Sequence, residues 1–129
     1  MRRKLLLVAL IILALINLGQ TYQRVIIYQL DLSQWYETGS MTSDISLTVT
    51  HAAESGKTFV LKGFIVGGTQ QGHGDLYFGD TKIMILRFSA NRTIGANIVL
   101  EAPENTLIKV VLTLDTTGNG EIFLYGTRR

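Results

Sequence analysis

Hydrophobic residues follow two different patterns along this chain of 129 residues. Residues 5–18 are apolar at every position except Asn17, and the basic residues Arg2, Arg3 and Lys4 come directly before them. Beyond this run, apolar residues alternate with polar ones in short segments. An unbroken apolar run indicates a helix in apolar surroundings, whereas alternation with a period of two indicates strands that bury one face. We therefore expect one N-terminal hydrophobic helix followed by an all-β domain.

The N-terminal segment has the layout of a secretory signal, because a basic cap precedes the apolar run and the polar stretch 19–23 follows it. Basic residues stay on the cytoplasmic side of a membrane, so the chain after residue 21 is expected outside the cytoplasm. Signal cleavage favours an Ala-x-Ala pattern, which is absent, whereas a bilayer span needs about 20 apolar residues. Residues 1–21 are thus predicted as either a cleaved signal or a retained anchor that crosses the membrane with residues 5–22. Residues 22–129 are predicted as the exported domain.

Short alternating segments continue to the end of the chain, and Gly-rich or polar turns separate them. In residues 59–66, the pattern places Phe59, Leu61 and Ile65 on one face of a strand. Regular short strands with such turns favour a small β-sandwich or jelly-roll-like domain of antiparallel strands. About eight strands are expected, at residues 24–30, 45–49, 59–66, 76–78, 83–88, 97–100, 108–114 and 122–125.

Three stretches are predicted as connections between these strands. Residues 31–43 contain the only tryptophan and show no clear alternation. Residues 67–74 form a glycine-rich stretch that is expected to be a long loop. Residues 115–120 read Asp-Thr-Thr-Gly-Asn-Gly, a composition that tolerates the positive φ angles of tight turns, so a hairpin loop is expected there.

The charge balance argues against a nucleic-acid-binding function. The chain has a net charge of +2 and a pI near 9.0, but three of its twelve basic residues precede the apolar run. The remaining nine are scattered among ten acidic residues, whereas a nucleic-acid-binding domain carries a clustered basic face. The absence of cysteine excludes disulfides and zinc–thiolate sites.

The candidate metal ligands are few and lack a recognisable spacing. His73 and Asp75 lie in the glycine-rich stretch with Asp80 shortly after them, and His51 follows a predicted strand. Imidazole and carboxylate groups can share a metal ion, but no rigid element fixes their separation in this sequence. Residues 115–121 offer oxygen atoms without the alternating acidic positions of a calcium loop. We therefore assign no metal site.

No sequence motif indicates an enzyme. Gly67 and Gly68 are not followed by Lys-Ser/Thr or by a helix, so they do not form a phosphate-binding loop. No serine lies in a nucleophile-elbow context. We assign no catalytic residue and no cofactor, and the protein is not expected to be an enzyme.

Two further features suit an exported domain. Asn91-Arg92-Thr93 is an N-glycosylation sequon in a predicted turn. Tyr28, Trp35 and Tyr36 could stack on a ligand or form an interfacial belt close to the anchor, but the sequence favours their packing against the edge of the sandwich.

Two functions follow from these observations. The first is a structural or interaction module at the cell envelope, either membrane-anchored or secreted. It would associate with itself or with an envelope protein, because residues 24–30 could complete a neighbour's sheet rather than their own. The alternative is a carbohydrate- or other ligand-binding module on a jelly-roll scaffold. The residues 67–75 and the aromatic side chains would form its site, and a cluster of exposed aromatics on one face would favour it.

Overall fold

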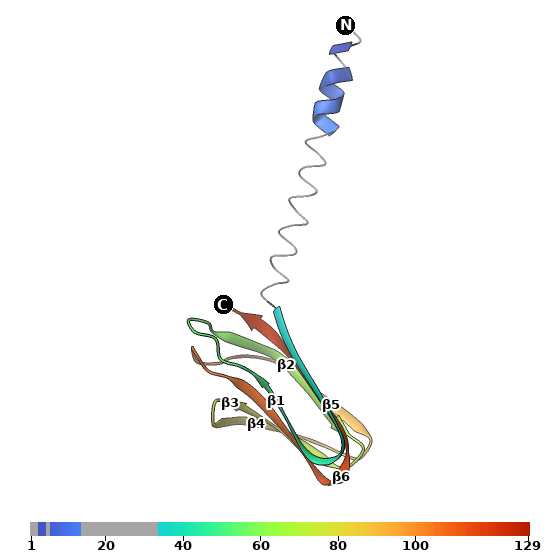
Figure 1. Cartoon of the computed structure of the whole chain (residues 1–129), viewed down its shortest axis with the longest axis vertical. Helices are drawn as coiled ribbons and strands as arrows, with labels where there is room; N and C mark the ends of the chain where they lie inside the picture. The colour runs from blue at the N-terminus through green and yellow to red at the C-terminus, as the bar shows by residue number, and fades with distance from the viewer. Residues whose placement is uncertain (1–2, 5, 14–33) are drawn as a thin grey trace. The chain divides into compact units, whose positions relative to one another are not determined.

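The computed structural model describes residues 3–4, 6–13 and 34–129, which belong to two separate units of the chain (Figure 1). In the N-terminal unit, residues 3–4 and 6–13 are helical and their side chains are exposed. None of the helices described reaches the length and hydrophobicity that a membrane crossing requires. The predicted strand at 24–30 and the predicted cleavage region lie outside the described residues.

The second unit is an all-β domain, as the sequence predicts. Its six strands run antiparallel and form one hydrogen-bonded sheet. They are β1 (Gln34–His51), β2 (Phe59–Gly68), β3 (Gly72–Phe78), β4 (Thr81–Phe88), β5 (Arg92–Glu101) and β6 (Ile108–Arg128).

The sheet folds over into two layers because β1 and β6 each pass from one layer to the other (Figure 1). The first layer has the order β4, β3, the first half of β6 and the second half of β1. The second layer has the order β5, β2, the second half of β6 and the first half of β1. Eight strand segments in two four-stranded layers, connected in this order, form a jelly roll. The predicted fold class is confirmed.

The sequence placed the corner of this fold incorrectly. Residues 115–120 were expected to join two strands that pair with each other, but they lie inside β6. The two halves of β6 pair instead with the two halves of β1. The pairing shifts abruptly between Asp44, opposite Gly118, and Ser46, opposite Thr113, and Ser43 has a positive φ of 52°. These irregularities bend β1 and β6 at opposing positions. The glycine and asparagine residues of 115–120 therefore form a bend within β6 and not a hairpin turn.

Two other predicted connections are also largely strand. Most of residues 31–43 belong to β1, which begins at Gln34. Its inward-facing positions include Glu37 and Gly39, so the alternation of apolar and polar residues that marks a strand is absent from the sequence there. The glycine-rich loop shrinks to residues 69–71, because β2 continues to Gly68 and β3 begins at Gly72. Glycine is needed there for close packing: a Cβ on Gly72 would lie 2.3 Å from the carbonyl oxygen of Thr113.

A bulge in β2 changes which of its residues face the core. Lys62 is an extra residue relative to β6, because Leu61 lies opposite Gly126 while Gly63 lies opposite Tyr125. The shift turns Phe64 inward and Ile65 outward, contrary to the face predicted for Ile65. The outer face of the second layer therefore gains Gly63 and Ile65.

The core lies between the two layers and consists almost entirely of apolar side chains. Phe59 and Phe64 are its largest fully buried residues. The first half of β6 contributes alternate residues, from Ile108 to Leu114, and its second half contributes Ile122 and Leu124. Within residues 34–129, Asp75 is the only charged residue that is buried.

An aromatic cluster closes the end of the sandwich where β1 begins. The ring of Trp35 stacks on His51 with a centroid distance of 4.1 Å, and Phe59 meets His51 edge-on at 4.4 Å. His51 Nδ1 lies 2.9 Å from a carboxylate oxygen of Glu37, and the Trp35 indole donates to the carbonyl oxygen of Thr127. The cluster therefore ties both ends of β1 to the end of β6.

Leu112→Ala is expected to destabilise the domain by about 3 kcal/mol, because it opens a cavity where both layers meet. Val111→Ala is the matched control. Its side chain points outward from the same strand, and the loss should be about 1 kcal/mol or less. Chemical denaturation followed by the fluorescence of Trp35, the only tryptophan, measures both. Equal losses would contradict the two-layer arrangement.

Candidate functional site

Three aromatic side chains lie in contact on the outer face of the second layer. We call Tyr36 of β1 with Phe123 and Tyr125 of β6 the aromatic strip. The rings of Tyr36 and Phe123 stack with a centroid distance of 6.3 Å, and those of Phe123 and Tyr125 are 5.7 Å apart. Tyr36 is 71% exposed and Phe123 is 37% exposed. Single exposed aromatics are common, but three neighbouring aromatic rings on one face form a patch that water solvates poorly.

The position of Tyr125 depends on the glycine beside it. Tyr125 lies opposite Gly63 of β2, which lies opposite Asn97 of β5. A Cβ on Gly63 would be 2.5 Å from the Tyr125 hydroxyl oxygen, so the phenol ring occupies the space that a side chain would take. The hydroxyl then donates a hydrogen bond of 2.8 Å to Asn97 Oδ1. Tyr125 thus lies across β2 and is held at both ends.

The aromatic strip lies at one end of a chain of hollows along this face. The hollow beside it has a volume of about 400 Å³ and is also bordered by Lys62 and Gln34. The next, of about 660 Å³, lies between Thr38, Ile65 and Phe123. The third, of about 390 Å³, lies at the corner of the sheet. The first and second hollows share Phe123, and the second and third share Ser40, Thr93 and Glu121, so the three lie in a row from the aromatic strip to the corner. We call this row of hollows the groove.

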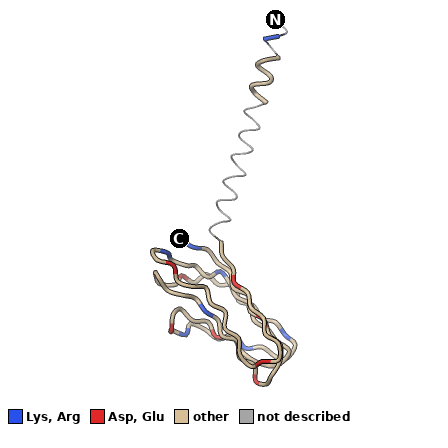
Figure 2. Tube along the Cα trace, viewed as in Figure 1, with Lys and Arg blue, Asp and Glu red and all other residues tan. Residues whose placement is uncertain are grey.

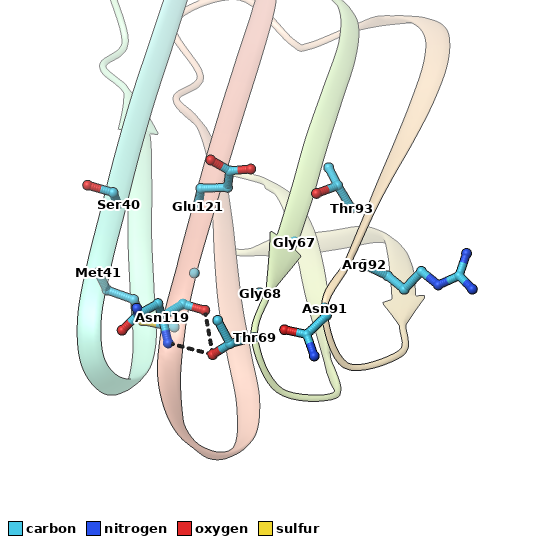
Figure 3. A pocket seen from close by; sticks show the side chains of 11 residues that line it. Ser40, Met41, Gly67, Gly68, Thr69, Asn91, Arg92, Thr93, Asn119 and Glu121 are labelled. Atoms are coloured by element: carbon cyan, nitrogen blue, oxygen red, sulfur yellow. Dashed lines mark hydrogen bonds between the residues drawn. The ribbon is translucent and has the colours of Figure 1, made fainter.

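The corner end of the groove is polar and held by backbone hydrogen bonds (Figure 3). The backbone N–H of Asn119 donates to Thr69 Oγ1 at 2.9 Å, and the backbone N–H of Thr69 donates to the backbone carbonyl oxygen of Asn119 at 2.9 Å. The carboxamide of Asn91 points toward this pair, whereas Arg92 extends away from the hollow (Figure 3). This end therefore offers hydroxyl and amide groups at fixed positions.

The groove carries little charge. Lys62 borders one end, and Glu121 and Arg92 border the other. Charged residues are scattered over residues 34–129 without a run of one sign (Figure 2). A partly aromatic groove with few charges and no excess of one sign suits a neutral, extended ligand better than a phosphate-rich one.

The candidate metal ligands lie on the other outer face, that of the first layer. His73 Nδ1 and Lys82 Nζ each lie 3.0 Å from a carboxylate oxygen of Asp75. Asp80 is fully exposed and lies 3.8 Å from Lys109 Nζ instead. Among the residues that the structure describes, no three histidine or acidic side chains converge on one point. The two histidines are also apart, because His51 belongs to the aromatic cluster around Trp35.

Asp75 organises a cationic cluster rather than a metal centre. The hydrogen bond from Lys82 to Asp75 raises the pKa of the Lys82 ammonium above its usual 10.5, while desolvation acts in the opposite direction. Lys82 and Lys109 both approach the ring of Tyr77, at 5.6 and 5.1 Å from its centroid. The positive charges are thus paired with carboxylates and an aromatic ring of the same face.

The other candidates from the sequence separate in the fold. Trp35 is in the core, Tyr36 belongs to the aromatic strip, and Tyr28 lies outside the described residues. Asn91 is exposed in the turn between β4 and β5 with a φ of 56°. Residues 67–75 contribute to the groove only through Gly67, Gly68 and Thr69.

Phe123 and Tyr125 were missed as site residues. The sequence placed them in the last strand and gave no reason to separate them from the core. The available signal was their alternation with Ile122 and Leu124. A strand in a two-layer sandwich buries only one face, so a strand with apolar residues on both faces must leave the apolar residues of its outer face exposed.

No protein-family model matches the chain, and no curated protein resembles it in sequence. Solved structures with a similar fold include the NLP core of Drosophila, with 18% identity, a TM-score of 0.44, and coverage of 73% of this chain and 97% of that one. The capsid of Helicobacter pylori bacteriophage KHP30 is 10% identical with a TM-score of 0.47, covering 73% and 86%. A family 16 carbohydrate-binding module is 18% identical with a TM-score of 0.36, covering 70% and 74%. Likenesses this distant carry no functional argument.

Gly63→Ala is expected to destabilise the domain by about 1–3 kcal/mol, because the new methyl group would lie 2.5 Å from the Tyr125 hydroxyl oxygen and 2.8 Å from the carbonyl oxygen of Ala96. It should also lift the ring of Tyr125 from the sheet. Gly95→Ala is the control on the same face, since its methyl group would meet Ile65 at 3.3 Å and no part of Tyr125. Denaturation gives the stability, and the side-chain NMR signals of Asn97 report its hydrogen bond. An unchanged Asn97 signal in Gly63→Ala would show that Gly63 does not position the ring.

Proposed function

We propose that the β domain is a binding module that takes an extended polysaccharide chain along the groove of its second layer. The observation that carries the proposal is the aromatic strip, in which the ring of Phe123 lies against those of Tyr36 and Tyr125 on an exposed face. The core does not require them there, because alternate residues of the same strands already fill it. Their exposure is a cost that ligand binding would explain.

The chemistry of the groove matches that of a sugar chain. One face of a pyranose ring presents C–H bonds with partial positive charge, which stack on the negative face of an aromatic ring. The spacings of 5.7 and 6.3 Å between neighbouring rings are comparable to the length of one pyranose unit. Sugar hydroxyl groups both donate and accept hydrogen bonds, as the side chains of Thr38, Thr93 and Asn91 along the groove do.

The N-terminal segment would deliver this module outside the cytoplasm. Its basic cap and apolar run support export, with the segment retained as a membrane anchor. The structural role predicted from residues 24–30 rests on a segment outside the described residues and stays a prediction.

Binding is expected to depend on the aromatic strip. A glycan array followed by electrophoresis in gels containing the best polysaccharide would measure it. Phe123→Ala and Tyr125→Ala should each weaken binding about tenfold, since each removes one stacking surface. Tyr77→Ala is the matched control, because Tyr77 is an aromatic residue on the outer face of the other layer. No retained glycan, or equal losses in all three variants, would contradict the proposal.

The retained anchor has its own test. The protein expressed with its N-terminal segment in a bacterial host should be found in the membrane fraction with the intact mass of residues 1–129. A soluble exported product that lacks about the first 20 residues would instead show signal cleavage.

A further inference from the structure

Strand β5 forms an open edge of the second layer. It pairs with β2 on one side, and no other described strand lies along its opposite side. Natural proteins usually protect such edges with charged residues or proline, because a free edge can pair with another chain. Residues 93–100 of β5 contain neither.

Charged residues protect parts of the other edges of the domain. Strand β4 carries Lys82 and Arg87 along its length. Strand β1 contains Glu37 and Asp44, and its register shifts at the corner bend it away from a straight template. Two uncharged edges remain among the described strands: residues 45–51 of β1 in the first layer and residues 93–100 of β5 in the second layer. The edge of β5 is the longer of the two and carries the most exposed apolar side chain, that of Val99.

The outer side of β5 also has a self-complementary shape. Val99 is 76% exposed, the highest value among the large apolar residues of this domain. Gly95 lies four residues before it on the same outer face, and the space above Gly95 is open apart from Ile65. Asn97 lies midway between them, and its hydrogen bond to Tyr125 links its side chain to the groove side of β5.

We infer that β5 pairs antiparallel with β5 of a second copy about a two-fold axis at Asn97. This register places each Val99 opposite the partner's Gly95, so that the exposed side chain covers the open position. Residues directly opposite in an antiparallel pair share a face, so the outer and inner faces of both copies stay continuous. In this register Glu101 lies opposite Thr93 and Arg92 lies opposite Ala102, so Arg92 and Glu101 of the two copies are neighbours along the pair without lying directly opposite each other. Glu101 also lies 3.2 Å from Arg129 of its own copy.

The pairing would join the two second layers into one sheet that runs through both copies. Both grooves would then open on the same face of the dimer. If the proposed polysaccharide binding holds, one chain could engage two grooves, which raises the apparent affinity through the effective concentration of the second site. The dimer itself does not depend on that function.

Asn97→Cys tests the axis directly, because the protein contains no other cysteine. A residue on the axis faces its own copy at about 4.5–5.5 Å between Cα atoms, which is within disulfide range. The full-length variant in detergent should form a disulfide-linked dimer when an oxidant is added. Thr93→Cys is the control, since four residues from the axis its two copies would be roughly 27 Å apart. Equal cross-linking of both variants, or none of Asn97→Cys, would overturn the inference.

Val99→Lys tests the contact without an added thiol. It should convert the full-length dimer to a monomer in sedimentation experiments, because it places two charges against the paired edge. Ile85→Lys makes the same kind of change, from an exposed apolar residue to lysine, in β4, and it should leave the dimer intact. A wild-type monomer at micromolar concentration, or an equal effect of both variants, would refute the pairing. Monomeric Val99→Lys should still bind glycan in each copy, so failure of the dimer and failure of the binding site are distinguishable.

Discussion

The pairing of β1 with β6 on both sides of the corner is the constraint on which this domain depends. The two longest strands remain paired from Gln34 opposite Thr127 to His51 opposite Ile108, while both bend from one layer to the other. Every remaining strand finds its place relative to one half of this ladder, β3 beside the first half of β6 and β2 beside the second. The corner therefore has to bend without breaking the ladder, which is why irregular pairing at residues 41–46 matches the glycine- and asparagine-containing bend of β6.

The same constraint separates the residues that the fold requires from those that it leaves free. In the second half of β6, Ile122 and Leu124 are buried between the layers, and this fixes Phe123 and Tyr125 on the outside. Nothing in the core calls for large apolar groups at these outer positions. The neighbouring strand has a glycine, Gly63, where a side chain would overlap the ring of Tyr125, and the Tyr125 hydroxyl group therefore reaches Asn97.

The sequence predicted the fold class because the inward positions of its clearest strands are uniformly apolar, as in residues 108–114. It failed where inward positions are not apolar, since Glu37 and Gly39 concealed the first half of β1. It failed at residues 115–120 because a strand corner and a hairpin turn favour the same residue types, glycine and asparagine. The two structures differ only in which strands pair with each other, and the sequence does not show the pairing. The groove was inaccessible for a third reason: Tyr36, Gly63 and Tyr125 are far apart in the chain, and the bulge at Lys62 decides which side of β2 they meet.

The two outer faces of the sandwich differ in chemistry, and this difference favours the second layer as the one that meets a ligand. On the first layer, the polar groups satisfy one another: Asp75 binds both His73 and Lys82, and Tyr77 lies between two ammonium groups. A ligand there would have to displace interactions already made. On the second layer, the aromatic strip has one hydrogen bond at its edge and otherwise faces solvent, so a ligand would displace only poorly held water.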